Sequence, residues 1–431
     1  MGGTAVIRSQ AVGEMLSFLT RNARWLAGGL LLCFFSGFGQ TYFISLSNES
    51  IRTALDLSHA EFGLAYSIAT LASAFTVAKF GHLADRWSPR RSAAIVIMCL
   101  GLAAFLMSFS ILSVLILVPA LYGLRLFGQG FCGHVAMTSA GKWFERNRGK
   151  AVSIVGLGFP LSEMTMPVLA AGVLSLAGFQ ALWAGGAGVL IFSALPAIFL
   201  LLRKDRLPGS ADPHENQNVT SEVLNNWRRR DVMKRVEFYL VLVAVLCPPF
   251  MNTAFFFHQQ HLAEIKSWPI SMMVGSMTVF ALAQIASSLL TGFLIDRIGS
   301  KIILSVYLMP LAIGLTIPAF TESSLVIPLV LGFMGLSNGA AASLLGALWP
   351  ELFGSKHLGE IRALAYAAMV ASTAASPLLT GVLIDVGVRF DLQLACCGAF
   401  SLLASALMFL IQPNLRRLNA SLLPNELKQK S

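Results

Sequence analysis

Leu121-Tyr-Gly-Leu-Arg125-Leu-Phe-Gly128-Gln129-Gly130-Phe-Cys-Gly133 places an arginine inside an apolar segment, residues 112–140, that is long enough to cross a bilayer. An arginine at this depth costs roughly 2.5–3.5 kcal/mol on insertion scales, so such residues usually face a bundle interior or a water-filled cavity. Arg125, Gln129 and Gly133 follow at intervals of four residues and therefore share one face of a helix. The run predicts a membrane-spanning helix with a buried charge.

Three glycines surround this arginine: Gly123, Gly128 and Gly130. They remove side-chain bulk and predict that neighbouring helices approach closely here. Two interpretations of Arg125 remain open. It either holds two helices in register as a structural residue or faces a cavity and binds a ligand, and the second is the default for an intramembrane charge.

The composition indicates a polytopic membrane protein. Of the 431 residues, 56% are hydrophobic and only 12% are charged, whereas soluble domains are about a quarter charged. We predict an all-α integral membrane fold with twelve transmembrane helices, at residues 25–46, 60–80, 92–110, 112–140, 149–176, 179–202, 237–260, 270–294, 301–320, 324–349, 358–385 and 392–412.

Lysine and arginine lie almost entirely on one side of the predicted membrane. If both termini are cytoplasmic, all but four of the 31 Lys and Arg fall in or beside cytoplasmic segments; the exceptions are Arg52, Lys266 and Arg389 in outer loops and Arg125 in a span. Positive charge collects on the cytoplasmic side. We therefore expect a multi-pass protein of the bacterial inner membrane with both termini in the cytoplasm. Because the net charge of +10 comes from short loops, it does not indicate nucleic-acid binding.

A polar interval divides the spans six and six. It begins Arg203-Lys-Asp-Arg206 and ends in a basic cluster that is expected to lie on the inner leaflet. The predicted domains are a cytoplasmic N-terminus (1–24), an N-terminal six-helix bundle (25–202), a cytoplasmic linker (203–236), a C-terminal six-helix bundle (237–412) and a cytoplasmic tail (413–431).

The two halves repeat one another. Gly81-His-Leu-Ala-Asp85-Arg86 is matched 211 residues later by Gly292-Phe-Leu-Ile-Asp296-Arg297, and Pro167 is matched 210 residues later by Pro377. Matches at nearly one offset indicate duplicated six-span units in parallel orientation, as in secondary transporters.

These motifs resemble those of the major facilitator superfamily. Gly-x-x-x-Asp-Arg between spans two and three is similar to its signature loop, and Arg125-Leu-Phe-Gly128-Gln129-Gly130 is similar to its fourth-helix motif. The resemblance implies two six-helix bundles that rock around a central cavity lined by spans one, four, seven and ten. Spans five and eleven resemble, more loosely, the monocarboxylate and oxalate–formate type branches. The sequence departs from the drug–proton antiporter branch, because Phe159 separates Gly158 from Pro160.

The repeated loops are predicted to act in gating. Gly81 and Gly292 allow a tight turn and close helix contact. Asp85 and Asp296 are expected to accept hydrogen bonds from helix N-termini. The arginines that follow them, Arg86 and Arg297, are expected to pair with carboxylates or carbonyls across the closing interface.

Glu163 at the centre of span five is the other buried charge. It lies at a similar depth to Arg125 on the next helix, so we expect the two to pair when no ligand is bound. A substrate anion would compete with Glu163 for Arg125. An apolar setting favours the neutral form of a carboxyl group, which makes Glu163 the candidate for proton coupling.

Amide side chains supply the remaining candidates for substrate binding. They are Gln40 in span one, Gln129 in span four, Asn252 in span seven, Gln284 in span eight and Asn338 in span ten. An alternative role is helix–helix hydrogen bonding, worth about 0.6 kcal/mol on average in membranes. Leu336 stands 211 residues after Arg125, so the charges belong to the N-terminal half alone and the predicted site is asymmetric.

Together these features predict a secondary transporter, and not an enzyme, for a small organic solute, with an anion favoured. The alternatives are a proton-driven efflux pump for mixed organic compounds and a transporter-like sensor. No His-Glu-x-x-His motif or phosphate-binding Gly-x-x-x-x-Gly-Lys-Ser/Thr loop occurs, and the six cysteines fall in apolar spans. We therefore expect no cofactor and no metal, the lipid bilayer as surroundings, protons as a candidate coupling ion, and a monomer.

Overall fold

The structure of the protein is a computed structural model that describes residues 2–144, 147–204, 227–354 and 356–420; at 2–12, 14, 15, 82–86, 419 and 420 it describes the backbone only. Every regular element in these ranges is a helix. The α-helices are α1 (Gly2–Phe35), α2 (Thr41–Ile44), α3 (Asn48–Leu55), α4 (His59–Arg86), α5 (Pro89–Met107), α6 (Val114–Gly123), α7 (Gly133–Trp143), α8 (Arg148–Gly156), α9 (Gly158–Gly188), α10 (Leu195–Leu201), α11 (Arg229–Val232), α12 (Val236–Phe257), α13 (Gln259–Ile265), α14 (Ile270–Ile298), α15 (Ser300–Val306), α16 (Met309–Thr316), α17 (Ile327–Phe353), α18 (Leu358–Asp385), α19 (Phe390–Leu410) and α20 (Gln412–Ala420).

The helices make up the twelve predicted spans. Ten runs in the described residues are long and apolar enough to cross a membrane, and the pair Leu16–Gly39 and Thr41–Leu55, bent by 47°, forms another. The run Arg148–Leu201 has 54 residues, roughly 80 Å of helix, which is more than twice the hydrocarbon thickness. It bends at Gly178, whose φ of +81° is readily adopted only by glycine. This run is therefore two spans, and the predicted fold class is confirmed.

Local sequence explains where the helices begin and end. At the start of α4, the Ser58 hydroxyl accepts from the backbone N–H of Glu61, and the Glu61 carboxylate accepts from the N–H of Ser58. At the end of α14, Gly299 adopts a φ of +84° and stops the helix one residue beyond the second Asp-Arg pair. Between α5 and α6, where the predicted spans nearly touch, a 3-10 turn at Ser110–Leu112 separates the helices.

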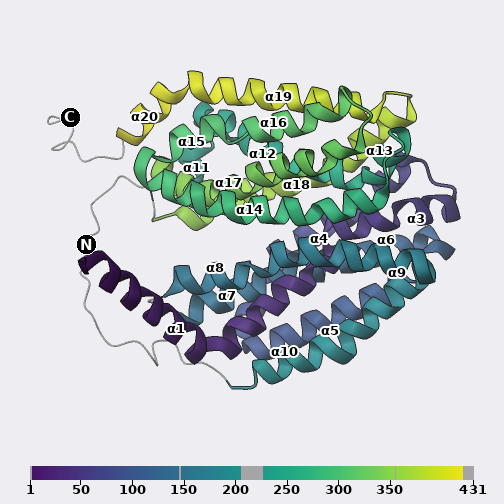
Figure 1. Cartoon of the computed structure of the whole chain (residues 1–431), viewed down its shortest axis with the longest axis horizontal. Helices are drawn as coiled ribbons and strands as arrows, with labels where there is room; N and C mark the ends of the chain where they lie inside the picture. The colour runs from purple at the N-terminus through teal and green to yellow at the C-terminus, as the bar shows by residue number, and fades with distance from the viewer. Residues whose placement is uncertain (1, 145–146, 205–226, 355, 421–431) are drawn as a thin grey trace.

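The two halves lie side by side as separate bundles (Figure 1), with the N-terminal half below and the C-terminal half above in that view. Helix α4 of the first half packs against α18 of the second, and α14 of the second packs against α9 of the first. The contact of span two with span eleven is therefore equivalent to the contact of span eight with span five, as expected for two parallel repeats. Of the predicted linker, residues 205–226 lie outside the described residues, as do residues 421–431 of the tail.

Hydrogen bonds between the halves are concentrated toward the end of the molecule that carries α3 and α13 (Figure 1). There Asn48 donates to the carbonyl of Phe257, and Gln260 donates to the carbonyl of Leu46. Nearer the middle, the Ser67 hydroxyl of α4 donates to the Ala374 carbonyl of α18, and Gln284 donates to Glu163. We call the bonded region at α3 and α13 the seal.

Candidate functional site

Arg125 is buried between three spans of the N-terminal half. It is the second residue of a π-helical stretch, Leu124–Cys132, and is only 1% exposed. Its Nε donates to the Thr70 hydroxyl at 3.1 Å, and its Nη1 donates to the Gly39 carbonyl at 2.9 Å. The guanidinium carbon lies 5.0 Å from the centre of the Tyr66 ring, a cation–π contact. Arg125 thus contacts span one through Gly39 and span two through Thr70 and Tyr66.

A break in span one supplies the carbonyl that Arg125 uses. The α-helical hydrogen bonds of α1 stop at Phe35, and a 3-10 turn at Ser36–Gly39 is followed by extended backbone at Gln40. The break leaves the Gly39 carbonyl available to a side chain. A methyl group at Gly128 would lie 2.6 Å from the Gly39 Cα, so the two backbones touch. The close helix approach predicted from the glycines of span four is confirmed.

One nitrogen of the guanidinium, with its two N–H groups, remains unused. Nη2 of Arg125 is buried and has no hydrogen-bond partner. Within the part of the chain that the structure describes, no aspartate or glutamate lies within 4.0 Å of this side chain. A buried arginine without a carboxylate is costly, because its charge has lost its water without gaining a counter-ion. The site therefore offers a positive charge and a free N–H to an anion.

The predicted ion pair between Arg125 and Glu163 is wrong for this structure. Glu163, half-buried on α9, accepts a hydrogen bond from Nε2 of Gln284 on α14, at 3.2 Å. The prediction compared only the depths of the two residues. The break in span one gives the guanidinium a carbonyl partner, and Glu163 bonds to the other half of the protein.

Four predicted site residues form one hydrogen-bonded chain. Asn252 on α12 donates to Asn338 on α17 at 3.1 Å, Asn338 donates to Gln284, and Gln284 donates to Glu163. Every amide donates in the direction of the carboxylate, which suits an ionised Glu163 because it can only accept. The Oδ1 atom of Asn252 is buried and without a donor at the far end. The sequence proposed these residues one by one, and the structure brings them together across the two halves.

Gln40 and Gln129 lie beside Arg125. Gln40 directly follows Gly39, and Gln129 lies four residues after Arg125 in the π-helical stretch. Both are half-buried, and no hydrogen bond within the described residues holds either side-chain amide. Sequence reasoning missed Tyr366 on α18, which is 57% exposed and close enough to Arg125 to interact with it electrostatically.

The structure only partly describes the predicted gating residues. Gly81 lies in α4 next to His134, while the side chains of Asp85 and Arg86 lie outside the described part. In the second repeat, Gly292, Asp296 and Arg297 lie on the last turns of α14, and the Arg297 guanidinium covers the Phe293 ring at 4.1 Å.

The hydrogen bond expected of Asp296 is made by another residue. Asp296 is exposed, and no hydrogen bond or ion pair within the described residues holds it. Glu351 of α17 instead accepts from the backbone N–H of Ser300 at 3.2 Å, at the start of α15. Lys301 lies 3.5 Å from the same carboxylate group. Nothing in the repeated motif identified Glu351, because it lies on a different helix.

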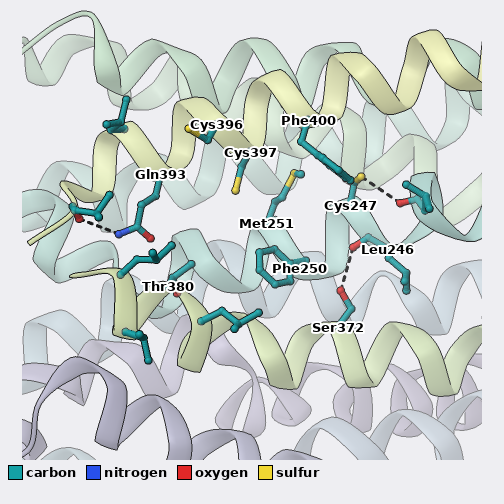
Figure 2. A pocket seen from close by; sticks show the side chains of 16 residues that line it. Leu246, Cys247, Phe250, Met251, Ser372, Thr380, Gln393, Cys396, Cys397 and Phe400 are labelled. Atoms are coloured by element: carbon teal, nitrogen blue, oxygen red, sulfur yellow. Dashed lines mark hydrogen bonds between the residues drawn. The ribbon is translucent and has the colours of Figure 1, made fainter. Parts of the chain in front are cut away.

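A separate cavity of about 850 Å³ lies inside the C-terminal half, between α12, α18 and α19 (Figure 2). Its walls are almost entirely apolar and include Met251, Phe250 and Phe400, together with the thiols of Cys396 and Cys397. None of the predicted site residues lines it. The described residues contain no group of His, Cys, Asp or Glu suited to a metal ion.

Known proteins match the chain over most of its length. The family model of the Major Facilitator Superfamily matches residues 29–277 and 250–430. An oxalate:formate antiporter of Oxalobacter formigenes is 21% identical over 337 residues, which is 76% of each chain.

Solved structures share the fold. A bacterial homologue of the human lysosomal transporter Spinster, inward-facing and occupied, superposes with a TM-score of 0.70 at 13% identity over 93% of this chain and 98% of that one. The xylose transporter XylE from E. coli, inward open, gives a TM-score of 0.66 at 15% identity over 91% and 95% of the two chains.

Proposed function

Because the chain belongs to the major facilitator superfamily and is therefore a multi-pass membrane transporter, we propose that it moves a small organic anion, a carboxylate, by alternating access. In this proposal the protein lies in a bacterial inner membrane with both termini in the cytoplasm. The distribution of lysine and arginine supports this orientation. The seal at α3 and α13 then faces outward.

One observation carries the choice of an anion: Arg125 has a buried Nη2 donor with no partner, and no carboxylate of the described residues lies within 4.0 Å of its side chain. A guanidinium presents a planar fork of donors that matches a carboxylate and stays protonated. An anion at Nη2 would neutralise the charge and satisfy the donor together. The relative from Oxalobacter formigenes, named for two carboxylates, supports the same substrate class.

Access to Arg125 requires a side chain to move, since the residue is 1% exposed. Tyr366 of α18 is the exposed neighbour and belongs to the opposite half. Rocking of the halves would carry α18 past α4 and change the position of Tyr366 relative to Arg125. Gln40 and Gln129 flank this position and are the proposed further contacts of the substrate.

Glu163 is the proposed site of proton coupling. Its carboxylate ends the chain of amides that joins the two halves, so a change in its charge acts on the interface directly. Uptake of a proton would remove a negative charge from the membrane interior where the anion binds. Anion and proton would then bind together.

The test is binding to the purified protein in detergent, measured by thermal shift and calorimetry with formate, oxalate and lactate as probes and a cationic dye as comparison. We expect at least one carboxylate to bind. Arg125→Lys keeps the charge but loses the fork, and should weaken that binding by about 10- to 100-fold, the worth of one or two charge-assisted hydrogen bonds. Arg24→Lys is the matched control, because Arg24 also uses two nitrogens, on the Leu201 carbonyl, away from this site.

Two outcomes would overturn the proposal. Equal carboxylate affinity in the parent and in Arg125→Lys would make Arg125 the structural residue that its bonds to Gly39 and Thr70 also fit. Binding of the cationic dye alone would favour the efflux pump.

A further inference from the structure

Three histidines meet where the two halves join at the seal. His59 is the first residue of α4, His258 follows α12, and His261 lies in α13. The ring centres of His59 and His261 are 4.5 Å apart, and those of His59 and His258 are 5.6 Å apart. One imidazole thus comes from the first half and two from the second.

The same residues take part in the hydrogen bonds that hold the seal. The Asp385 carboxylate at the end of α18 accepts from the backbone N–H groups of His59, at 3.1 Å, and Ala60, at 2.8 Å. Gln259, next to His258, donates to the Ser45 hydroxyl of the first half at 2.9 Å. The histidines are therefore part of the contact between the halves.

Two of the imidazoles are buried with an unsatisfied nitrogen. His258 is 1% exposed and His59 is 9% exposed, and the Nδ1 atom of each is buried without a partner. Nε2 of His258 lies 3.3 Å from the Pro377 carbonyl, which can only accept, so this nitrogen carries the proton of the neutral ring. A second proton on Nδ1 would have no acceptor in the closed seal.

Three carboxylates and one arginine surround the cluster, but within the described residues none of the carboxylates forms an ion pair with the imidazole of His59 or His258. Helix α3 contributes Arg52, whose charge opposes protonation of the histidines, and Glu49. Glu264 lies on α13, 3.8 Å from His261 and more than half exposed, and the Asp385 carboxylate already accepts two backbone N–H groups. Helix α19 contributes the apolar ring of Phe390.

We propose that this cluster is a proton sensor: protonation of His59, His258 and His261 separates the two halves at the seal and opens this end of the transporter. Buried like charges repel, and opening lets water reach the rings. The inference rests on the proposed function only in placing this opening within a transport cycle.

The direction of the pH effect follows from burial. Burial lowers the pKa of His258 to about 3. The other two imidazoles and Arg52 also lower this pKa, whereas the hydrogen bond to the Pro377 carbonyl raises it. Burial and Arg52 also lower the pKa of His261. Once the seal opens, hydrated imidazoles regain a pKa near 6.5. Above that pH both states are neutral and the seal is unaffected; below it, the open state takes up protons first and gains population.

The size of the effect can be stated per histidine. One pH unit below 6.5, a single imidazole of this kind shifts the closed-to-open ratio about tenfold toward open. His258 and His59 acting together would shift it by up to about 100-fold.

The experiment measures the width of the seal by pulsed EPR in nanodiscs without substrate. Spin labels are attached at Thr53→Cys on α3 and Ile265→Cys on α13, both exposed, in a variant whose six native cysteines are replaced. We expect a single short distance at pH 7.5 and, at pH 5.5, a longer distance whose share relative to the short one rises at least tenfold. The double substitution His59→Gln and His258→Gln should remove this rise.

His134→Gln is the matched control, because Nε2 of His134 is also buried and unpaired but lies on α7, away from the seal. It should retain the acid response. If the double variant does not fold, His261→Gln, at a partly exposed position, should reduce the response several-fold. Unchanged distances between pH 7.5 and 5.5 in the parent, or a full response in the double variant, would overturn the sensor. Neither result depends on anion binding at Arg125.

Discussion

Two buried cations, one in each half of the molecule, have opposite surroundings. Lys266 follows α13 in a loop of the C-terminal half and is 4% exposed. Its ammonium lies 2.8 Å from both Glu322 and Asp391. Arg125, in the membrane interior of the N-terminal half, is 1% exposed and has a hydroxyl and a carbonyl as partners, with its Nη2 nitrogen unused.

The presence or absence of carboxylate partners separates Lys266, a structural charge, from Arg125, a candidate for ligand binding. Burial alone would lower the pKa of Lys266, but its hydrogen bonds to Asp391 and Glu322 raise it above the ordinary value. That cation is fully compensated and ties the loops that precede α14 and α17 to the first turn of α19. Arg125 keeps an unmet requirement for a counter-ion, which in our proposal the substrate supplies.

The largest contrast is expected in thermal stability. Lys266→Met would leave the buried Asp391 carboxylate with the exposed Arg389, at 2.7 Å, and the backbone N–H of Leu392. Breaking a buried ion pair costs about 3–5 kcal/mol, so Tm should fall by several degrees. Arg125→Met removes a buried charge that has no counter-ion, and Tm should stay constant or rise.

Differential scanning fluorimetry of the two variants in the same detergent measures this contrast, with the carboxylate probes as a second readout. Lys266→Met should keep its anion affinity, whereas Arg125→Met should lose it. A strong loss of stability in Arg125→Met, comparable to that in Lys266→Met, would remove the distinction between the two cations.

Sequence patterns predicted the fold because apolar length, glycine and the repeated Asp-Arg turn are local signals. Twelve spans and the close packing at Gly128 follow from residues near one another in the chain. The partners of Arg125 did not follow: Gly37 and Gly39 weaken span one at Ser36–Gly39, but they do not indicate which side chain uses the carbonyl that the break leaves free.

The polar side chains, too, could be predicted from the sequence one by one, but their partners could not. Asn252, Gln284 and Asn338 were identified as candidates because amides are rare in apolar spans, although their order in one chain ending at Glu163 required the structure. The histidine cluster was missed, since His59 lies about 200 residues before its partners. A local signal existed in His258-Gln-Gln-His261, which places two imidazoles near the end of one span.

A smaller effect is expected at Glu163, the negative counterpart of Arg125. Substrate anion and proton bind together in our proposal, so anion affinity should rise as pH falls, by up to about tenfold per unit. Glu163→Gln resembles the protonated form and still has an acceptor for Gln284. It should bind the carboxylate probe with the parent's low-pH affinity at every pH. Calorimetry between pH 5.5 and 8.5 measures this, and a parent-like slope in Glu163→Gln would move proton coupling elsewhere.

The smallest effect is expected in the middle of the amide chain. Asn338→Leu removes the hydrogen bonds to Asn252 and Gln284, each worth about 0.6 kcal/mol in a membrane. Gln284 would then lose the acceptor interaction that orients its amide toward Glu163. Because the chain donates toward the carboxylate, its loss should make the ionised form of Glu163 less favourable and displace the pH profile of anion binding upward by a few tenths of a unit.

The control for this effect lies on the same two helices. Ser343 of α17 bonds to Ser288 of α14 through its hydroxyl, so Ser343→Ala removes a comparable contact between α14 and α17 without touching the chain. If Ser343→Ala displaces the pH profile as much as Asn338→Leu does, the two helices act on Glu163 only through their packing. A displacement confined to Asn338→Leu would mean that the amides of the C-terminal half tune the protonation of Glu163 in the N-terminal half. Anion binding at Arg125 would then be coupled to a proton through hydrogen bonds that join the two bundles.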